Sequence, residues 1–91
     1  MSIFVILSKT DNNRIETAIL NNFPNDYYKI SPGQWMVSVE GTARQVSEKI
    51  GITKEEHGPG PAIILAISGY YGRWSSELWE WMKNKLEKGN D

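Results

Sequence analysis

The feature that most constrains the fold is an uninterrupted apolar run in the last third of the chain. Residues Ala62 to Ile67 contain no polar side chain, and the segment after them carries Trp74, Trp79 and Trp81. A strand without polar alternation is usually covered on both faces, and a helix rich in large apolar side chains is usually buried. The two segments together predict that the last helix packs back over its own sheet.

The other periodic segments predict the order of elements. Strands are expected at residues 3–7, 27–30, 34–39 and 62–67, and helices at 15–23, 43–50 and 74–86. The first six elements follow the ferredoxin-like βαββαβ arrangement. We therefore expect residues 1–91 to form one α+β domain with an antiparallel four-stranded sheet. Two helices should cover one face of this sheet, and the added C-terminal helix should cover the other.

Polar residues and glycines specify where several of these elements begin and end. Asn13 with Glu16 predicts a cap for the first helix, and Thr42 with Gln45 predicts a capping box for the second. Gly51 suits the left-handed position that ends a helix. The tripeptide Ser31-Pro32-Gly33 predicts a tight hairpin between the second and third strands.

Composition excludes several classes of site. The chain has no cysteine, so it has neither a disulfide framework nor a thiolate zinc site. Its one histidine, His57, lies in a Gly-Pro loop and is expected to be solvated rather than catalytic. We expect no catalytic residue, cofactor or metal. The opening segment is too short for a signal peptide or a membrane span, which predicts a cytoplasmic protein with no membrane partner.

Aromatic residues are the candidate partner-binding groups. Trp79 and Trp81 are possible anchors, although packing in the core is the commoner role of such a stripe. Tyr27 and Tyr28 lie on an expected edge strand, whose unpaired backbone groups could be completed by a second copy. Ten aromatic residues are hard to bury in one small core, so we expect a homodimer with Trp79 near the contact.

A turn before the last helix is a candidate anion-binding site. Backbone amides near a helix start, with a guanidinium and hydroxyls, could bind a phosphate or carboxylate. The residues are Gly69, Gly72, Arg73 and Ser75. The segment lacks the Gly-Lys-Ser/Thr ending of a P-loop, and an ordinary glycine turn is the favoured interpretation.

Nucleic-acid binding is the alternative function. Tyr27, Tyr28, Lys29 and Trp35 on neighbouring strands, with Phe4 on the first, could stack bases as in RNA recognition motifs. A last helix over the sheet would block such stacking, and a net charge of −1 gives no general attraction to phosphates. Asp11 could bind a metal across a twofold axis, but a lone carboxylate after a strand is more often a helix cap.

The segment Gln34-Trp35-Met36-Val37-Ser38 before Thr42-Ala43, with the length and topology, resembles small ferredoxin-fold proteins related to the structural endonuclease subunit of CRISPR spacer acquisition. The resemblance covers about the first 68 positions at the level of the fold. It implies a homodimer and, for some members, metal-dependent nucleic-acid cleavage at an aspartate ending the first strand. Here that strand ends Leu7-Ser8-Lys9, with Asp11 further on. The function we expect from the sequence is a non-enzymatic binding or assembly module whose protein partner is unknown, with nucleic-acid binding or a metal-dependent nuclease as the alternative.

Overall fold

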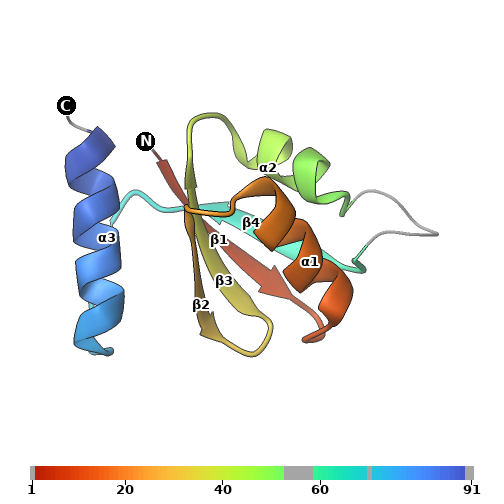
Figure 1. The fold of residues 1–91 in the computed structure, drawn as a ribbon, viewed down its shortest axis with the longest axis horizontal. Helices are drawn as coiled ribbons and strands as arrows, with labels where there is room; N and C mark the ends of the chain where they lie inside the picture. Colours follow the sequence, from red (N-terminus) through yellow and green to blue (C-terminus); the bar gives the residue numbers. More distant parts are fainter. Residues whose placement is uncertain (1, 53–58, 70, 90–91) are drawn as a thin grey trace.

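The computed structural model describes residues 2–52, 59–69 and 71–89, without the side chains of 87–89. Four strands and three helices follow one another in the predicted order (Figure 1). They are β1 (Ser2–Ser8), α1 (Asn13–Asn22), β2 (Tyr27–Ser31), β3 (Gln34–Val39), α2 (Ala43–Ile50), β4 (Ala62–Ala66) and α3 (Ser76–Gly89). The described chain is thus α+β, as the sequence predicts.

The four strands form one antiparallel sheet in the order β2-β3-β1-β4. β1 and β3 are central, and β2 and β4 are the two edges. The hairpin between β2 and β3 turns at Gly33, whose φ of 77° is the left-handed conformation that glycine adopts without strain. Figure 1 shows α1 and α2 on one side of the sheet and α3 on the other, so the molecule has three layers.

The main core lies between the sheet and the helices α1 and α2. Alternate residues of each strand point to this side, as the pleat requires. The buried members include Phe4 of β1, Trp35 and Val37 of β3, and Ile15 and Ile19 of α1. All five are at most 1% exposed. This cluster explains why the predicted periodicities of the first two helices are correct.

A second, smaller core lies under α3. Its buried residues are Ile3 of β1, Met36 of β3, and Leu78 and Met82 of α3. Tyr28, Ile30 and Trp81 are among the partly buried side chains around it. The prediction that the last helix packs on the opposite face of the sheet is correct for this part of the sheet.

A polar clasp fixes α3 on the β2 side of the sheet. Lys85 Nζ donates to Asp26 Oδ1 at 2.7 Å and to the carbonyl oxygen of Asn25 at 2.9 Å. The same ammonium lies 5.9 Å from the centre of the Trp81 ring. Because Asn25 and Asp26 directly precede β2, these contacts hold the helix toward that edge of the sheet.

The helix ends agree with the sequence in two places and differ in one. Thr42 and Gln45 form the predicted capping box, and Gly51 ends α2 with a φ of 85°. The cap of α1 is Asn12 rather than Asn13: its side chain accepts a hydrogen bond from Ile15 N at 3.0 Å. The prediction was wrong by one residue because adjacent asparagines give the same local signal.

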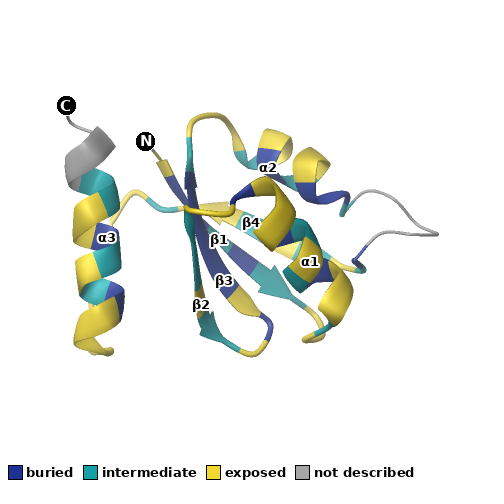
Figure 2. Cartoon of the chain, viewed as in Figure 1, coloured by how far each residue is buried: buried dark blue, intermediate teal, exposed yellow. Residues whose placement is uncertain are grey.

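Two packing predictions are wrong. β4 is not covered on both faces, since Ile63 and Leu65 are 59% and 47% exposed. Trp74 lies before α3 and is 51% exposed instead of packing in the core. Figure 2 shows exposed positions along β4, whereas the buried positions of α3 face the sheet.

Among the described helices, none combines the length and apolar content needed to cross a membrane.

Candidate functional site

The surface of this molecule that most resembles an interaction site is the part of the sheet that α3 leaves open. Val5 and Leu7 of β1 lie opposite Leu65 and Ile63 of β4 in the register of the sheet. By the alternation of the strands, all four side chains point to the α3 side. The two from β1 are half-buried and the two from β4 are exposed. We call these four residues the uncovered patch.

The backbone edge of β4 borders this patch. Lys9 N donates to Pro61 O at 3.1 Å, and Ile67 N donates to Ile3 O at 3.0 Å. Hydrogen-bonded pairs alternate along an antiparallel ladder, so every second residue of β4 directs its main-chain groups at β1. The main-chain groups between them point away from the sheet; they belong to Ala62, Ile64 and Ala66. In the described part of the chain, no strand pairs with this edge.

β4 also lacks the features that usually protect a sheet edge. Such strands commonly carry a lysine, a proline or a bulge that hinders pairing with another chain. β2, the other edge, has Lys29 at its centre and a register shift between Lys29 and Ser31. Residues Ala62 to Ala66 have no charge, no proline and a regular register with β1. Of the two edges, β4 is therefore the one open to pairing.

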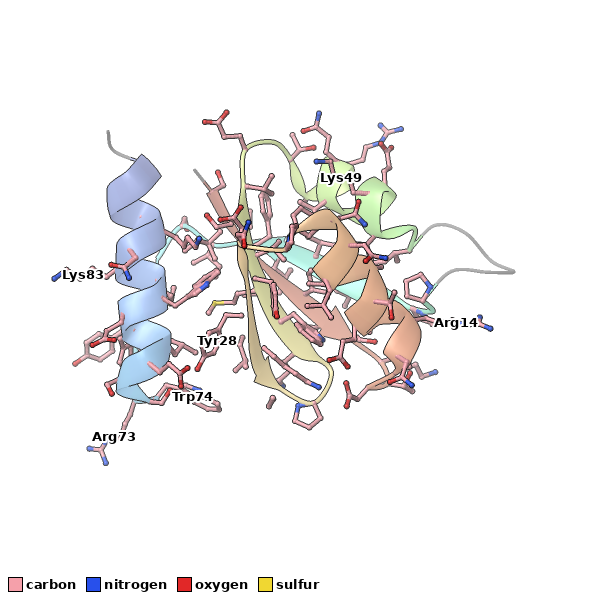
Figure 3. All side chains as sticks on the ribbon, in the orientation of Figure 1. Arg14, Tyr28, Lys49, Arg73, Trp74 and Lys83 are labelled. Carbon is pink, nitrogen blue, oxygen red and sulfur yellow. The ribbon has the colours of Figure 1, made fainter. Side chains whose placement is uncertain are left out.

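The candidate partner-binding aromatics lie on or beside β2. Tyr28 and Trp81 pack on each other with ring centres 5.9 Å apart, and Tyr27 packs on Trp35 at 6.1 Å. Trp79 is half-buried beside the second core. Tyr28 and Trp81 thus help to hold α3 on the sheet, as the sequence-based preference for packing anticipates (Figure 3 labels Tyr28).

The candidate anion-binding turn does not form a closed site among its described residues. Ser75 Oγ accepts a hydrogen bond from Leu78 N at 3.4 Å and so acts as a cap of α3. Arg73 is exposed, and Figure 3 shows its side chain pointing away from the rest of the molecule. Among the described residues, no atom lies within 4 Å of the position that a Cβ would take at Gly69 or Gly72, so close packing does not require either glycine. Tyr70 lies outside the described residues.

Asp11 has a structural role in the loop after β1. Its Oδ1 accepts a hydrogen bond from Gly33 N at 3.3 Å and lies 3.5 Å from Lys29 Nζ. These contacts join the β1–α1 loop to the β2–β3 hairpin. Across the described ranges, no three His, Cys, Asp or Glu side chains come together as a metal site. The residue His57 falls in 53–58, outside those ranges.

The residues considered for base stacking do not share one face. Phe4 and Trp35 are each 1% exposed and point into the main core under α1 and α2. Lys29 lies on the same side as Trp35, with its ammonium 5.0 Å from the centre of that ring. Tyr28 faces α3 instead. A stacking surface built from these residues would require the core to open.

The sequence pattern does not predict the uncovered patch. The apolar run at 62–67 predicts a strand buried on both faces, but an edge strand that is covered on one face only can have the same apolar pattern. The signal that could have indicated this patch is the lack of any charge or proline on a strand expected at an edge.

Comparison with known proteins found no matching protein-family model, curated protein or solved structure.

Proposed function

We propose that this chain is a ferredoxin-like βαββαβ domain with an added C-terminal helix, and that it works as a non-enzymatic binding and assembly module that forms a homodimer. The central position of β1 and β3 and the antiparallel pairing support the fold. A chain without cysteine has no need of an oxidising compartment, which supports a cytoplasmic location.

The observation that carries the function is the uncovered patch beside an unprotected edge. Ile63 and Leu65 are exposed next to half-buried Val5 and Leu7, so apolar side chains form one continuous surface. Contiguous apolar surface on a folded domain typically marks a contact with another protein. Along the same edge, backbone groups that have no strand partner among the described residues add directional hydrogen bonds to that contact.

Light scattering of a charge variant tests this function. The mass of the wild-type protein should approach twice the chain mass of 10.4 kDa as its concentration rises to the high micromolar range. Leu65→Lys should shift the mass toward the monomer, because it places a charge within the apolar contact. Leu20→Lys is the matched control: Leu20 is 37% exposed on α1 and lies outside both cores, so this variant should remain dimeric.

Two results would contradict the proposal. One is a wild-type mass that stays at the monomer value into the high micromolar range. The other is manganese- or magnesium-dependent cleavage of RNA or DNA that Asp11→Asn abolishes, because it would show an enzyme and favour the nucleic-acid alternative. The contacts of Asp11 with Lys29 and the Gly33 amide lead us to expect no such cleavage.

A further inference from the structure

We infer that the occupant of the β4 edge is β4 of a second copy, paired antiparallel about a twofold axis at Ile64, so that two four-stranded sheets join into one of eight strands. This inference rests on the proposed assembly function and names its partner and geometry. It follows from three properties of β4: which backbone groups point outward, which side chains meet, and what charge they carry.

The backbone groups determine the register. The main-chain N–H and C=O groups that point outward from β4 belong to the alternate residues Ala62, Ile64 and Ala66. A second copy must therefore align its own outward N–H and C=O groups with them. An axis at Ile64 pairs Ile64 with itself and Ala62 with Ala66 of the second copy. Each of these hydrogen-bonded pairs exchanges two bonds. An axis moved by one residue to either side would leave an end of the free edge without a partner from the other β4.

The side chains fit this register. Between the hydrogen-bonded pairs, Ile63 of one copy lies opposite Leu65 of the other, in the closely spaced kind of pair where side chains touch. Ile63 is 59% exposed and Leu65 is 47% exposed in the single chain, so pairing would remove apolar surface from water. Ala62 and Ala66 are small and do not obstruct the approach of a second strand.

Charge favours a second copy as well. A twofold axis brings a charged side chain that lies near the axis close to its own copy, and like charges in contact are destabilising. β4 carries no charged residue, so self-pairing has no such cost. β2 would bring Lys29 of both copies to one seam, and its register shift would interrupt the ladder. The sequence-based expectation placed self-association at the β2 edge; the structure favours β4.

The expected dimer is weak. One five-residue strand covers less area than an interface of standard size. α2 packs over β4 on the other face through Val46 and Ile50, which share a core with Ala62 and Ile64. The same axis therefore brings the two α2 helices near each other and adds to the contact. We expect dissociation in the micromolar range, because a small contact leaves little free energy after the cost of association.

Cysteine cross-linking tests the register. The chain has no native cysteine, so introduced thiols are the only ones present. An equimolar mixture of Ile63→Cys and Leu65→Cys proteins, treated with oxidised glutathione, should form a disulfide-linked heterodimer, since such opposed positions are close enough for a disulfide. Each variant alone should cross-link several-fold less, because its thiols lie diagonally across the seam at about 7–8 Å.

A charge exchange gives a second, reversible readout. Leu65→Lys alone should raise the dissociation constant at least tenfold. Adding Ile63→Glu to the same chain should restore most of the affinity, because each introduced carboxylate then faces an introduced ammonium of the other copy. Adding Ile63→Lys instead should not restore it, because like charges would then face each other.

The outcomes separate this inference from the proposed function. A heterodimer that cross-links selectively, with affinity restored by the charge exchange, supports β4 pairing. A wild-type dimer that Leu65→Lys disrupts but that shows neither selective cross-linking nor rescue would overturn the register while the assembly function stands. A wild-type protein that is monomeric at high micromolar concentration would overturn both.

Discussion

At the scale of single residues, the side chain of Asn12 caps the N-terminus of α1 and so determines the residue at which this helix begins. Its Oδ1 accepts a hydrogen bond from Ile15 N, and its amide donates to the carbonyl oxygen of Pro59 at 3.1 Å. The sequence could predict a cap in this region because Asn, Asp and Thr favour caps. It could not choose between Asn12 and Asn13, since the choice depends on where the chain leaves β1.

Asn12→Ala should therefore lower the free energy of unfolding by about 1–2 kcal/mol, the usual cost of losing a cap. Asn13→Ala is the matched control: Asn13 is an exposed first-turn residue, and alanine is the better helix former, so stability should be unchanged or slightly higher. Urea unfolding followed by tryptophan fluorescence measures both. Equal losses for the two variants would show that the cap is assigned to the wrong residue.

Lys85 is the residue that the sequence could not assign. Its partner Asp26 is 59 positions away, and no local pattern links them. We expect Lys85→Met to lower the free energy of unfolding by about 1–3 kcal/mol, because hydrogen bonds to charged groups are lost at a side chain only 12% exposed. Arg44→Met removes the exposed pair with Glu48 and should change stability by less than about 0.5 kcal/mol. If Lys85→Met were as stable as Arg44→Met, the hydrogen bonds of Lys85 to Asp26 and Asn25 would not stabilise α3 on the sheet.

At the scale of elements, local signals predicted the strands, the first two helices and the capping box of α2. These features depend on side chains a few residues apart, so a single sequence contains the required information. How much of the sheet α3 covers depends instead on long-range contacts, among them the hydrogen bond from Lys85 of α3 to Asp26 before β2. With this contact and the buried Leu78 and Met82, α3 lies over part of the sheet, and Ile63 and Leu65 stay exposed, a result that hydrophobicity alone could not give.

The attachment of α3 has a direct test. Leu78 is 5% exposed and packs against Ile3 and Met36, so Leu78→Ala should lower the free energy of unfolding by about 2–5 kcal/mol. Leu20→Ala removes the same atoms from a half-exposed position on α1 and should cost much less. Thermal or urea unfolding compares the two. An unchanged midpoint for Leu78→Ala would mean that α3 does not pack on the sheet as described.

At the scale of the whole molecule, the three layers leave the β4 edge without a strand partner among the described residues. α1 and α2 cover one face, α3 covers part of the other, and the uncovered part meets the free edge of β4 (Figures 1 and 2). The sequence indicated self-association from the number of aromatic residues. It could not locate the contact, because several of those aromatics pack on one another inside the domain.

Amide hydrogen exchange as a function of protein concentration tests the central claim most directly. If the β4 edges of two copies pair, the amides of Ala62, Ile64 and Ala66 should become protected as the protein concentration rises through the micromolar range. The outward amides of the other edge, those of Tyr27 and Lys29, should exchange at a constant rate and serve as the control within the same sample. Exchange at the β4 amides that does not depend on protein concentration would contradict the pairing of two β4 edges.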